Sequence, residues 1–207
     1  MKKLFTSVVL LLSVFIANSQ VLDTPQPAGD NKSHSFSSVY LIYSPAKYYG
    51  QNSDSDPFMK FAIGGDNASL LPIDNFSVYF TKGLMAEWYH KTADKLTTNM
   101  FSVKAPFNVM FDIKLSNQMS VLPFAGVNAS LGILARIENS STHYNLYSKD
   151  DMGSYALRRF LVGWQVGTRI NYKGFYGMVS FEKSFMTAGK NIDTKLGGVN
   201  IGIGKYL

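Results

Sequence analysis

Long alternation of apolar and polar residues is the feature that most constrains the fold of this chain. In residues 126–138, GVNASLGILARIE, every second residue is apolar, and the odd positions from Phe101 to Leu115 are apolar as well. A helix repeats every 3.6 residues and cannot keep a period of two over this length, whereas a β-strand places alternate side chains on opposite faces. The alternation therefore predicts β-strands.

The same pattern predicts eight strands, near residues 36–44, 58–65, 75–90, 99–116, 121–137, 155–172, 174–186 and 194–206. Tight turns are expected at Ser116-Asn117-Gln118 and at Lys173-Gly174. Longer polar connections are expected at 45–57, 91–98, 139–154 and 187–193, and the nine-residue connection 66–74 is an exception on the short-turn side. Short turns at one end and longer loops at the other are typical of bacterial transmembrane barrels, with periplasmic turns and extracellular loops.

The polar face of these strands indicates which side of the sheet meets lipid. Charged residues make up 16% of the chain, below the roughly 25% of soluble domains. In 121–137 and 194–206 the face opposite the apolar residues is rich in Gly, Asn and Ser, which suit the narrow interior of a barrel. We therefore predict an all-β fold: a closed, eight-stranded antiparallel transmembrane β-barrel with up-and-down topology and its apolar face outward. A soluble lipocalin-like barrel with an apolar interior is the alternative.

Lys82 interrupts the apolar face of strand 75–90, where a lysine at the middle of the bilayer costs roughly 2–4 kcal/mol. A bulge at Lys82-Gly83 would turn the side chain inward, and the sequence leaves both orientations open. Aromatic residues near strand ends predict two girdles at the membrane boundaries. The residues are Phe76, Tyr172 and Phe175 at the inner boundary, and Trp88, Phe101, Phe160 and Phe185 at the outer one.

The first residues, MKKLFTSVVLLLSVFIANSQ, have the parts of a secretory signal peptide. Lys2 and Lys3 form a basic start, and the apolar stretch that follows is shorter than the ~20 residues that span a bilayer. We predict a signal peptide at 1–19, a flexible periplasmic leader at 20–34 and the barrel at 35–207. The chain has no cysteine, so disulfides, thiolate metal sites and a lipoprotein anchor are excluded.

Four segments resemble a known family: MFSVKAPFNVMFDIKL, VLPFAGVNASLGILARI, FLVGWQVGTRINYKGFYGMVSFEKSF and the closing GVNIGIGKYL. They are similar to the small eight-stranded outer-membrane β-barrel domain family common in Bacteroides-like bacteria, with an OmpA/OmpX-like architecture. The resemblance covers 75–207 well and the first two strands weakly. It implies this fold, a bacterial outer-membrane location and insertion by the barrel-insertion machinery, and it implies no single activity. The last strand ends in Leu207, where an aromatic residue is usual.

Charged residues on the predicted inward faces have both signs, and an eight-stranded barrel leaves no room for an open channel. They are Glu87, Lys104, Asp112, Lys114, Arg136, Arg159, Arg169 and Glu182. Because buried charges must pair, we predict an interior polar network that fills the lumen, with Glu182 paired to Arg159 or Arg136. A transport or catalytic site is the alternative interpretation of the same residues.

The sequence contains no arrangement that predicts catalysis. The three histidines, His34, His90 and His143, lie in the leader, at a strand end and in a loop, and no serine is paired with a base. A Gly-rich phosphate loop and metal-ligand spacing are also missing from the sequence. We therefore predict a protein that is not an enzyme and has no cofactor or metal.

The predicted loops are rich in Tyr, Asn and Ser, which suits contact with a protein or glycan partner. The candidates are Tyr48, Tyr49, Tyr144 and Tyr147. Arg158 and Lys183 are placed to meet lipopolysaccharide phosphates, and no basic-aromatic motif suggests nucleic acid. We expect a non-catalytic outer-membrane barrel with a structural or surface-interaction role. The alternatives are an accessory component of an outer-membrane secretion or assembly complex and a lipid-modifying enzyme.

Overall fold

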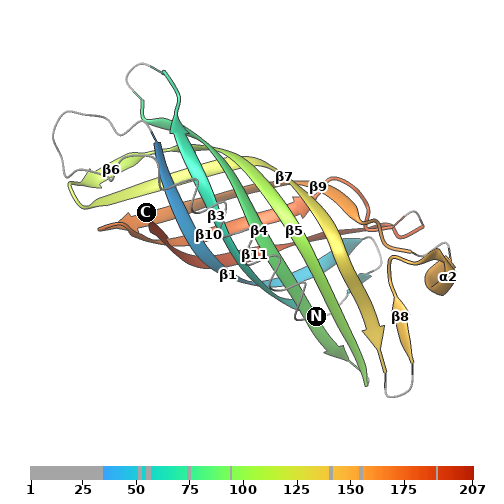
Figure 1. Cartoon of the computed structure of the whole chain (residues 1–207). Helices are drawn as coiled ribbons and strands as arrows, with labels where there is room; N and C mark the ends of the chain where they lie inside the picture. The colour runs from blue at the N-terminus through green and yellow to red at the C-terminus, as the bar shows by residue number, and fades with distance from the viewer. Residues whose placement is uncertain are drawn as a thin grey trace.

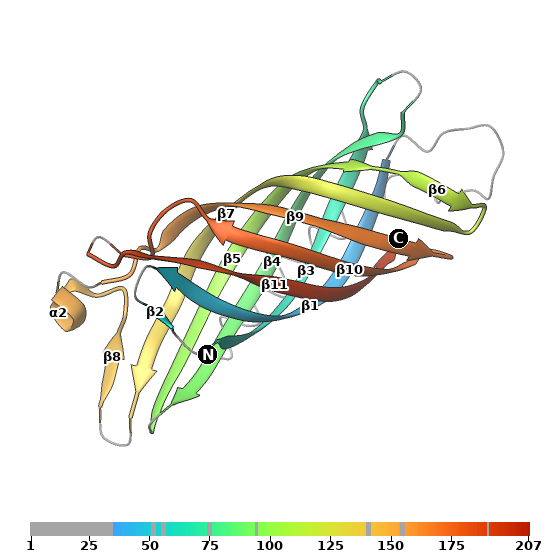
Figure 2. The same cartoon turned by 180° about the vertical axis from the view of Figure 1, so that it is seen from behind.

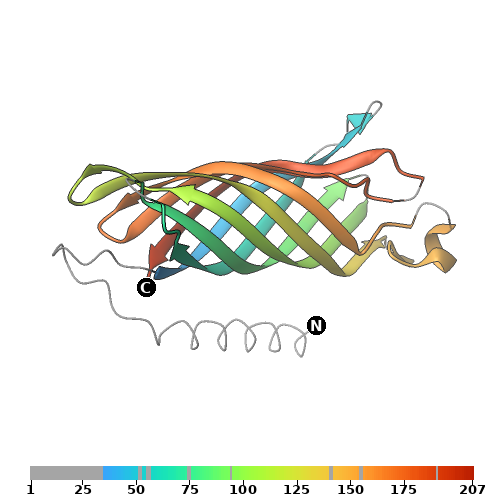
Figure 3. The ribbon, with the colours of Figure 1, turned by 90° about the horizontal axis from the view of Figure 1, so that it is seen from above.

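Eight long strands form a closed antiparallel β-barrel in the computed structural model (Figure 1). They are β1 (Ser35–Gly50), β3 (Phe58–Leu70), β4 (Val78–Ala93), β5 (Leu96–Phe111), β7 (Met119–Glu138), β9 (Phe160–Tyr172), β10 (Phe175–Ser184) and β11 (Thr194–Tyr206). Each pairs with the next along the chain, and β11 pairs with β1 to close the barrel, so the predicted fold is confirmed. Figure 3 shows the strands crossing the wall obliquely.

The structure describes residues 35–50, 53–54, 57–73, 76–93, 95–139, 142–153, 156–189 and 191–207. The predicted signal peptide and leader lie outside these residues. Four short elements complete the described part: β2 (Ser53–Asp54), β6 (Ile113–Ser116), β8 (His143–Asn145) and α2 (Lys149–Met152). In this part of the chain, no helix is both long enough and apolar enough to cross a membrane.

The two ends of the barrel differ (Figure 2). The end that carries the C-terminus and the β6–β7 hairpin, called here the turn end, includes the predicted turn at Lys173-Gly174. Both residues of that turn have positive φ, 50° and 84°, as a two-residue hairpin turn requires. The opposite end, called the loop end, carries β8 and α2. The Ser148 side chain caps α2 by accepting hydrogen bonds from the backbone of Asp150 and Asp151.

The predicted long loop at 91–98 is wrong. Strand β4 continues to Ala93 and β5 begins at Leu96, and these two residues pair directly. Lys95 between them has a positive φ of 66°, as in a tight turn. The β-branched residues Thr92 and Thr97, which pair across the hairpin, favour extended backbone even though their polarity resembles that of a loop.

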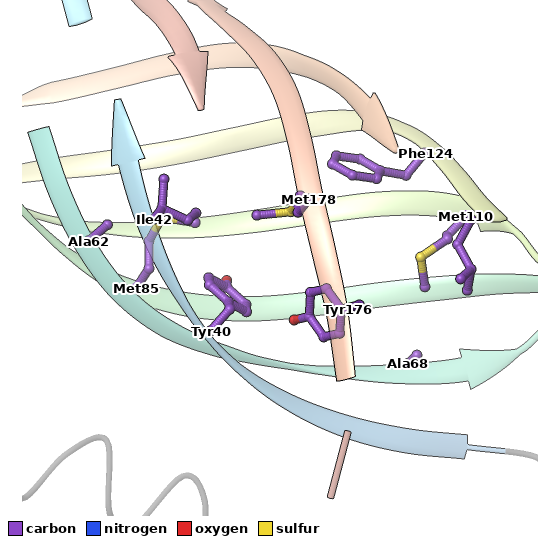
Figure 4. Packing of buried hydrophobic residues seen from close by; sticks show 10 residues of the cluster. Tyr40, Ile42, Ala62, Ala68, Met85, Met110, Phe124, Tyr176 and Met178 are labelled. Carbon is purple, nitrogen blue, oxygen red and sulfur yellow. The ribbon is translucent and has the colours of Figure 1, made fainter. Parts of the chain in front are cut away.

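The apolar residues face outward, as predicted. On β11, Ile201 and Ile203 are 55% and 68% exposed, whereas Asn200 and Gly202 beside them are buried. The interior is not only polar. A turn-end cluster of buried residues lies inside the barrel and is shown in Figure 4: Tyr40, Ile42, Ala62, Ala68, Met85, Met110, Leu122, Phe124, Tyr176 and Met178. A loop-end cluster lies nearer the opposite end: Ala46, Phe58, Tyr89, Met100, Ala135 and Leu146.

A β-bulge changes the facing of residues at the loop end of β7. Phe101 pairs with Leu134 but Ser102 pairs with Gly132, which leaves Ile133 as an extra residue. Because one extra residue reverses the alternation along a strand, Ala135 is buried beyond the bulge and Arg136 is exposed. The predicted inward position of Arg136 is therefore wrong.

Cysteine labelling of β7 tests the bulge. In the detergent-solubilised barrel, Arg136→Cys and Glu138→Cys will react with a water-soluble maleimide, whereas Ala135→Cys and Ile137→Cys will be protected. The chain has no other cysteine to interfere. A strand without the bulge gives the opposite alternation, so labelling of the odd positions in preference to the even ones contradicts the structure.

Lys82 lies on the outer face. Lys82 pairs with Asn67 on β3 and with Phe107 on β5, and neither strand pairing has a register shift. No bulge therefore turns the lysine inward. The side chain is exposed. On the same outer face, Phe61 stacks on Trp88 with ring centroids 6.2 Å apart. This aromatic pair lies nearer the loop end than Lys82 does.

Candidate functional site in the barrel interior and at its loop end

Four charged side chains meet inside the barrel, between the two apolar clusters. They are Lys60 on β3, Glu87 on β4, Lys104 on β5 and Glu182 on β10, and all four are buried. Lys60 Nζ lies 2.6 Å from Glu182 Oε1 and 3.4 Å from Glu87 Oε1. Lys104 Nζ lies 2.9 Å from Glu182 Oε1 and 2.7 Å from Glu87 Oε1. Each cation therefore bridges both anions, and we call these four residues the ion cluster.

Neutral donors complete the ion cluster. The Tyr89 hydroxyl and the Ser102 hydroxyl each donate to Glu87 Oε2 at 3.0 Å. Two ammonium groups and two carboxylates give the cluster no net charge. A buried charge is tolerated when it is paired and its remaining hydrogen-bonding capacity is met, and the ion cluster fulfils both conditions.

A second ion pair lies among the residues of the turn-end cluster. Arg169 on β9 donates to both oxygens of Asp66 on β3, and Ser38 donates to the same carboxylate at 2.6 Å. The Arg169 guanidinium lies against aromatic rings, 4.9 Å from the Tyr176 centroid and 5.9 Å from that of Tyr40. Planar guanidinium suits this combination of a carboxylate and ring faces.

A row of amides fills the lumen beside the ion cluster. Gln165 donates to Asn108 at 2.6 Å and accepts from Asn128 at 3.2 Å. The space left among these residues, the ion cluster and Arg169 is a cavity of about 20 Å³, enough for about one water molecule. Side chains therefore fill the lumen at this level and leave only this small cavity.

The structure places the predicted interior charges in three groups. Glu87, Lys104, Arg169 and Glu182 are buried in the lumen. Asp112 is half-buried where β5 passes into β6. Lys114, Arg136 and Arg159 are exposed.

Three of these predictions are therefore wrong, each for a physical reason. Lys114 lies on the β6–β7 hairpin, which extends past the turn end, so its side chain has no lumen to face. Arg136 is turned outward by the bulge. Arg159 precedes β9, and at the loop end it donates to the carbonyls of Gly132 and Ile133 at 3.4 and 3.3 Å. The predicted pairing of Glu182 with Arg159 or Arg136 is wrong, because its partners are Lys60 and Lys104.

Lys60 and Asp66 are interior residues that the sequence analysis missed. The sequence predicts a connection at 66–74 that includes Asp66, but β3 continues to Leu70. The signal was present in FMKFAIGGD, because Met59, Phe61 and Ile63 are the outward residues and the same alternation turns Lys60 and Asp66 inward. Extending that alternation through the two glycines would have found both partners.

Tyr147 and Tyr48 do not extend from the loops as predicted. The Tyr147 ring lies directly over Gly132, at a position that any Cβ there would occupy, and the Arg159 guanidinium lies 4.7 Å from the ring centroid. Burial raises the pKa of the Tyr147 phenol, and Arg159 acts in the opposite direction. Tyr48 packs edge-to-face on Phe58 inside the barrel, with centroids 5.5 Å apart. Loop residues thus close the loop end above a cavity of about 40 Å³.

Tyr144 and Tyr49 have different surroundings. Tyr144 is 47% exposed and, of the four predicted tyrosines, is the one suited to contact a partner at the loop end. Tyr49 lies on the outer wall between two lysines. No group of three or more His, Asp or Glu residues that could hold a metal occurs in the described ranges. His90 bonds to Asn99 at 2.9 Å on the outer face, and His143 is exposed.

A closed barrel with an apolar outer wall and a filled lumen belongs to the class of outer-membrane β-barrel folds. The attachment invasion locus protein Ail of Yersinia pestis is similar, with 12% identity, a TM-score of 0.50, and coverage of 84% of this chain and 97% of Ail. The outer membrane enzyme PagL is similar as well, with 9% identity, a TM-score of 0.54, and coverage of 81% and 98%. Neisserial surface protein A matches at 12% identity with a TM-score of 0.48, covering 84% and 97%.

No family model matches the sequence, and no curated protein matches it. At the identities above, the similarity extends to the fold alone. The resemblance to a family of Bacteroides-like bacteria therefore stays a prediction, and the function has to be argued from the residues of this chain.

Proposed function

We propose that this chain is a non-catalytic outer-membrane barrel that presents an ordered β-sheet at the cell surface for contact with a protein or glycan partner. The observation that carries the proposal is the continuation of β4, β5 and β7 beyond the apolar outer wall, with β8 added to the edge of β7. The loop end faces the outside of the cell, and the turn end faces the periplasm.

The chemistry of the outer face supports this sheet as a water-exposed platform. Beyond the paired residues Trp88 and Phe101, the next outward pairs toward the loop end are polar, His90 with Asn99 and Thr92 with Thr97. On β7 the bulge turns Arg136 to this same face, where without it Ala135 and Ile137 would point outward. One inserted residue thus changes an apolar lipid-facing wall into a polar surface at the level where the lipid ends.

The filled lumen supports a role that depends on this surface. The ion cluster and the amides occupy the space through which a solute would pass. Neither described histidine contacts a serine in the ranges that the structure covers, and the hydroxyl bonded to His90 is that of Thr92, at 3.4 Å on the exposed outer face of the β4–β5 hairpin. We infer no transport and no catalysis, and the rigid barrel acts as the support for the sheet.

A photoreactive amino acid at Tyr144 tests the proposal. In intact cells, illumination will link this position to a discrete partner, because the side chain is 47% exposed on the sheet beyond the lipid. The matched control is the same amino acid at Gln118, an exposed residue in the periplasmic turn. Absence of a product at Tyr144, or the same products at both positions, contradicts a surface-interaction role.

A second candidate function is that of an accessory component of a secretion or assembly complex. The observation that favours it is the β6–β7 hairpin, which extends past the turn end and exposes Ile113 and Leu115 by 51% and 59%. An apolar hairpin directed toward the periplasm is a surface for another subunit. In the experiment above, discrete products at Gln118 alone favour this candidate.

A further inference from the structure

Three lysines from three neighbouring strands meet on the outer wall near the loop end. They are Lys47 on β1, Lys195 on β11 and Lys183 on β10, called here the rim lysines. Gly197 on β11 is the direct partner of Lys47 on one side and of Lys183 on the other. Lys195 follows two residues farther toward the loop end and pairs with Tyr49.

The rim lysines face outward. Their neighbours Ala46 and Glu182 are buried inside the barrel, and Leu196 packs against the loop-end cluster. Since side chains alternate along a strand, Lys47, Lys183 and Lys195 point to the other side of the wall. They are half-buried there.

A tyrosine forms the floor between the rim lysines. A Cβ at Gly197 would lie 3.2 Å from Tyr49 Cε2, so the ring rests on the glycine and a larger residue would lift it. The Lys47 and Lys183 ammonium groups each lie 5.2 Å from the Tyr49 ring centroid. The Tyr49 ring thus makes cation–π contacts with two lysines whose strands, β1 and β10, are not neighbours in the sheet.

The rim lysines form no ion pair with the carboxylates whose side chains the structure describes, a set that leaves out Asp54 on β2. None of those carboxylates lies within 4.0 Å of the three ammonium groups, although the ion cluster shows that this protein pairs its other grouped charges. Three like charges on one patch repel each other, and an external anion removes that cost. The patch is therefore complementary to a multiply charged anion.

The position of the rim lysines relative to the apolar outer wall indicates which anion they bind. Toward the turn end, the outward residues below the rim lysines are apolar: Tyr43 on β1, Phe181 on β10 and Val199 on β11. The rim lysines are the first cations above this apolar wall, at the level of lipid headgroups. We propose that the rim lysines and Tyr49 bind the phosphate groups of the glycolipid in the outer leaflet, whose acyl chains lie along the wall below.

Lysine suits this role because its ammonium is a compact charge on a flexible stem that can follow a phosphate without fixed geometry. The inference rests on the outer-membrane location proposed above, but it does not depend on any partner at the sheet. A phosphorylated lipid has both the charge and the apolar tail that the surface requires. A soluble anion has no apolar part that could contact the wall below the rim lysines.

Binding of purified lipid A to the detergent-solubilised barrel tests the inference. The variant K47Q/K183Q/K195Q will bind bisphosphorylated lipid A about tenfold more weakly than the unchanged protein, the amount expected for three partly exposed ion pairs. The matched control K114Q/K149Q/K173Q removes three exposed lysines elsewhere and will bind normally. Tyr49→Leu, which keeps every charge, will weaken binding to a smaller extent. Heat-dependent gel mobility verifies that each variant is folded.

Two further lipids distinguish recognition of the lipid A phosphates from binding to any lipid or any anionic lipid. Dephosphorylated lipid A will bind all variants equally weakly, and phosphatidylglycerol will not distinguish the rim variant from its control. Equal weakening in both triple variants, or an effect of the rim variant on phosphatidylglycerol as large as on lipid A, overturns the inference. Because these measurements use pure components, they stand apart from the cross-linking at Tyr144, which can fail without affecting them.

Discussion

Replacing Glu182 by alanine will lower the free energy of unfolding by about 3–5 kcal/mol, as expected when one partner of a buried ion pair is removed. Both Lys60 and Lys104 rely on this carboxylate, at 2.6 and 2.9 Å, and only Glu87 remains to balance them. A lysine left without its partner carries a charge in a lumen that has little room for water, or loses its proton at a cost in free energy. The loss is therefore larger than the contribution of one hydrogen bond.

Urea unfolding in detergent, followed by gel mobility without boiling, measures this effect. The matched control is Glu138→Ala, which removes an exposed carboxylate from the outer face of β7 and will leave the midpoint unchanged. Adding Lys104→Met to Glu182→Ala restores charge balance and will recover part of the loss. If Glu182→Ala and Glu138→Ala have the same midpoint, the ion cluster does not stabilise the barrel.

Replacing Asp66 by alanine will have an effect of similar size, about 3–5 kcal/mol. Asp66 and Arg169 are 4% and 3% exposed, and the guanidinium is surrounded by aromatic rings. A buried lysine can lose its proton when its partner is removed, but arginine stays charged in proteins. Arg169 must therefore remain a buried cation or move out of its position between strands.

The double variant D66A/R169M distinguishes pairing from packing. It removes both charges and retains apolar volume at position 169, so it will be more stable than Asp66→Ala alone. Asp193→Ala, an exposed aspartate in the connection before β11, is the control and will be neutral. Equal destabilisation by Asp66→Ala and the double variant would show that Arg169 does not need its partner.

Alternation alone was sufficient to predict the barrel, because a period of two over eight segments admits few other folds. The same rule accounts for the interior position of Lys104 and Glu182. It fails at Arg136, because a bulge is one extra residue with no distinctive side chain, and Ile133 resembles its neighbours. It also fails where a polar strand segment is interpreted as a loop, as at Thr92 and Thr97 in the β4–β5 hairpin.

The partners of the ion cluster could not be predicted for a different reason. Which inward residues lie at the same height depends on the register of strands that are distant in the sequence. Glu182 on β10 meets Lys60 on β3 across the lumen, 122 residues apart in the chain. A sequence shows which face a residue occupies, but it contains no direct record of what lies opposite.

Polar residues interrupt the apolar wall on one side of the barrel. Lys82 on β4 and Asn67 on β3 lie side by side on the outer face, and Lys82 is paired on its other side with Phe107 on β5. Nearer the turn end, the outer face is apolar again at Phe80 on β4 and at Val109 and Phe111 on β5, which are 39%, 39% and 48% exposed. Lys82 therefore lies within the apolar wall, with apolar residues on the side toward the turn end as well. We expect the bilayer to be thinned beside β3 and β4, with Lys82 extending toward the phosphates of the inner leaflet.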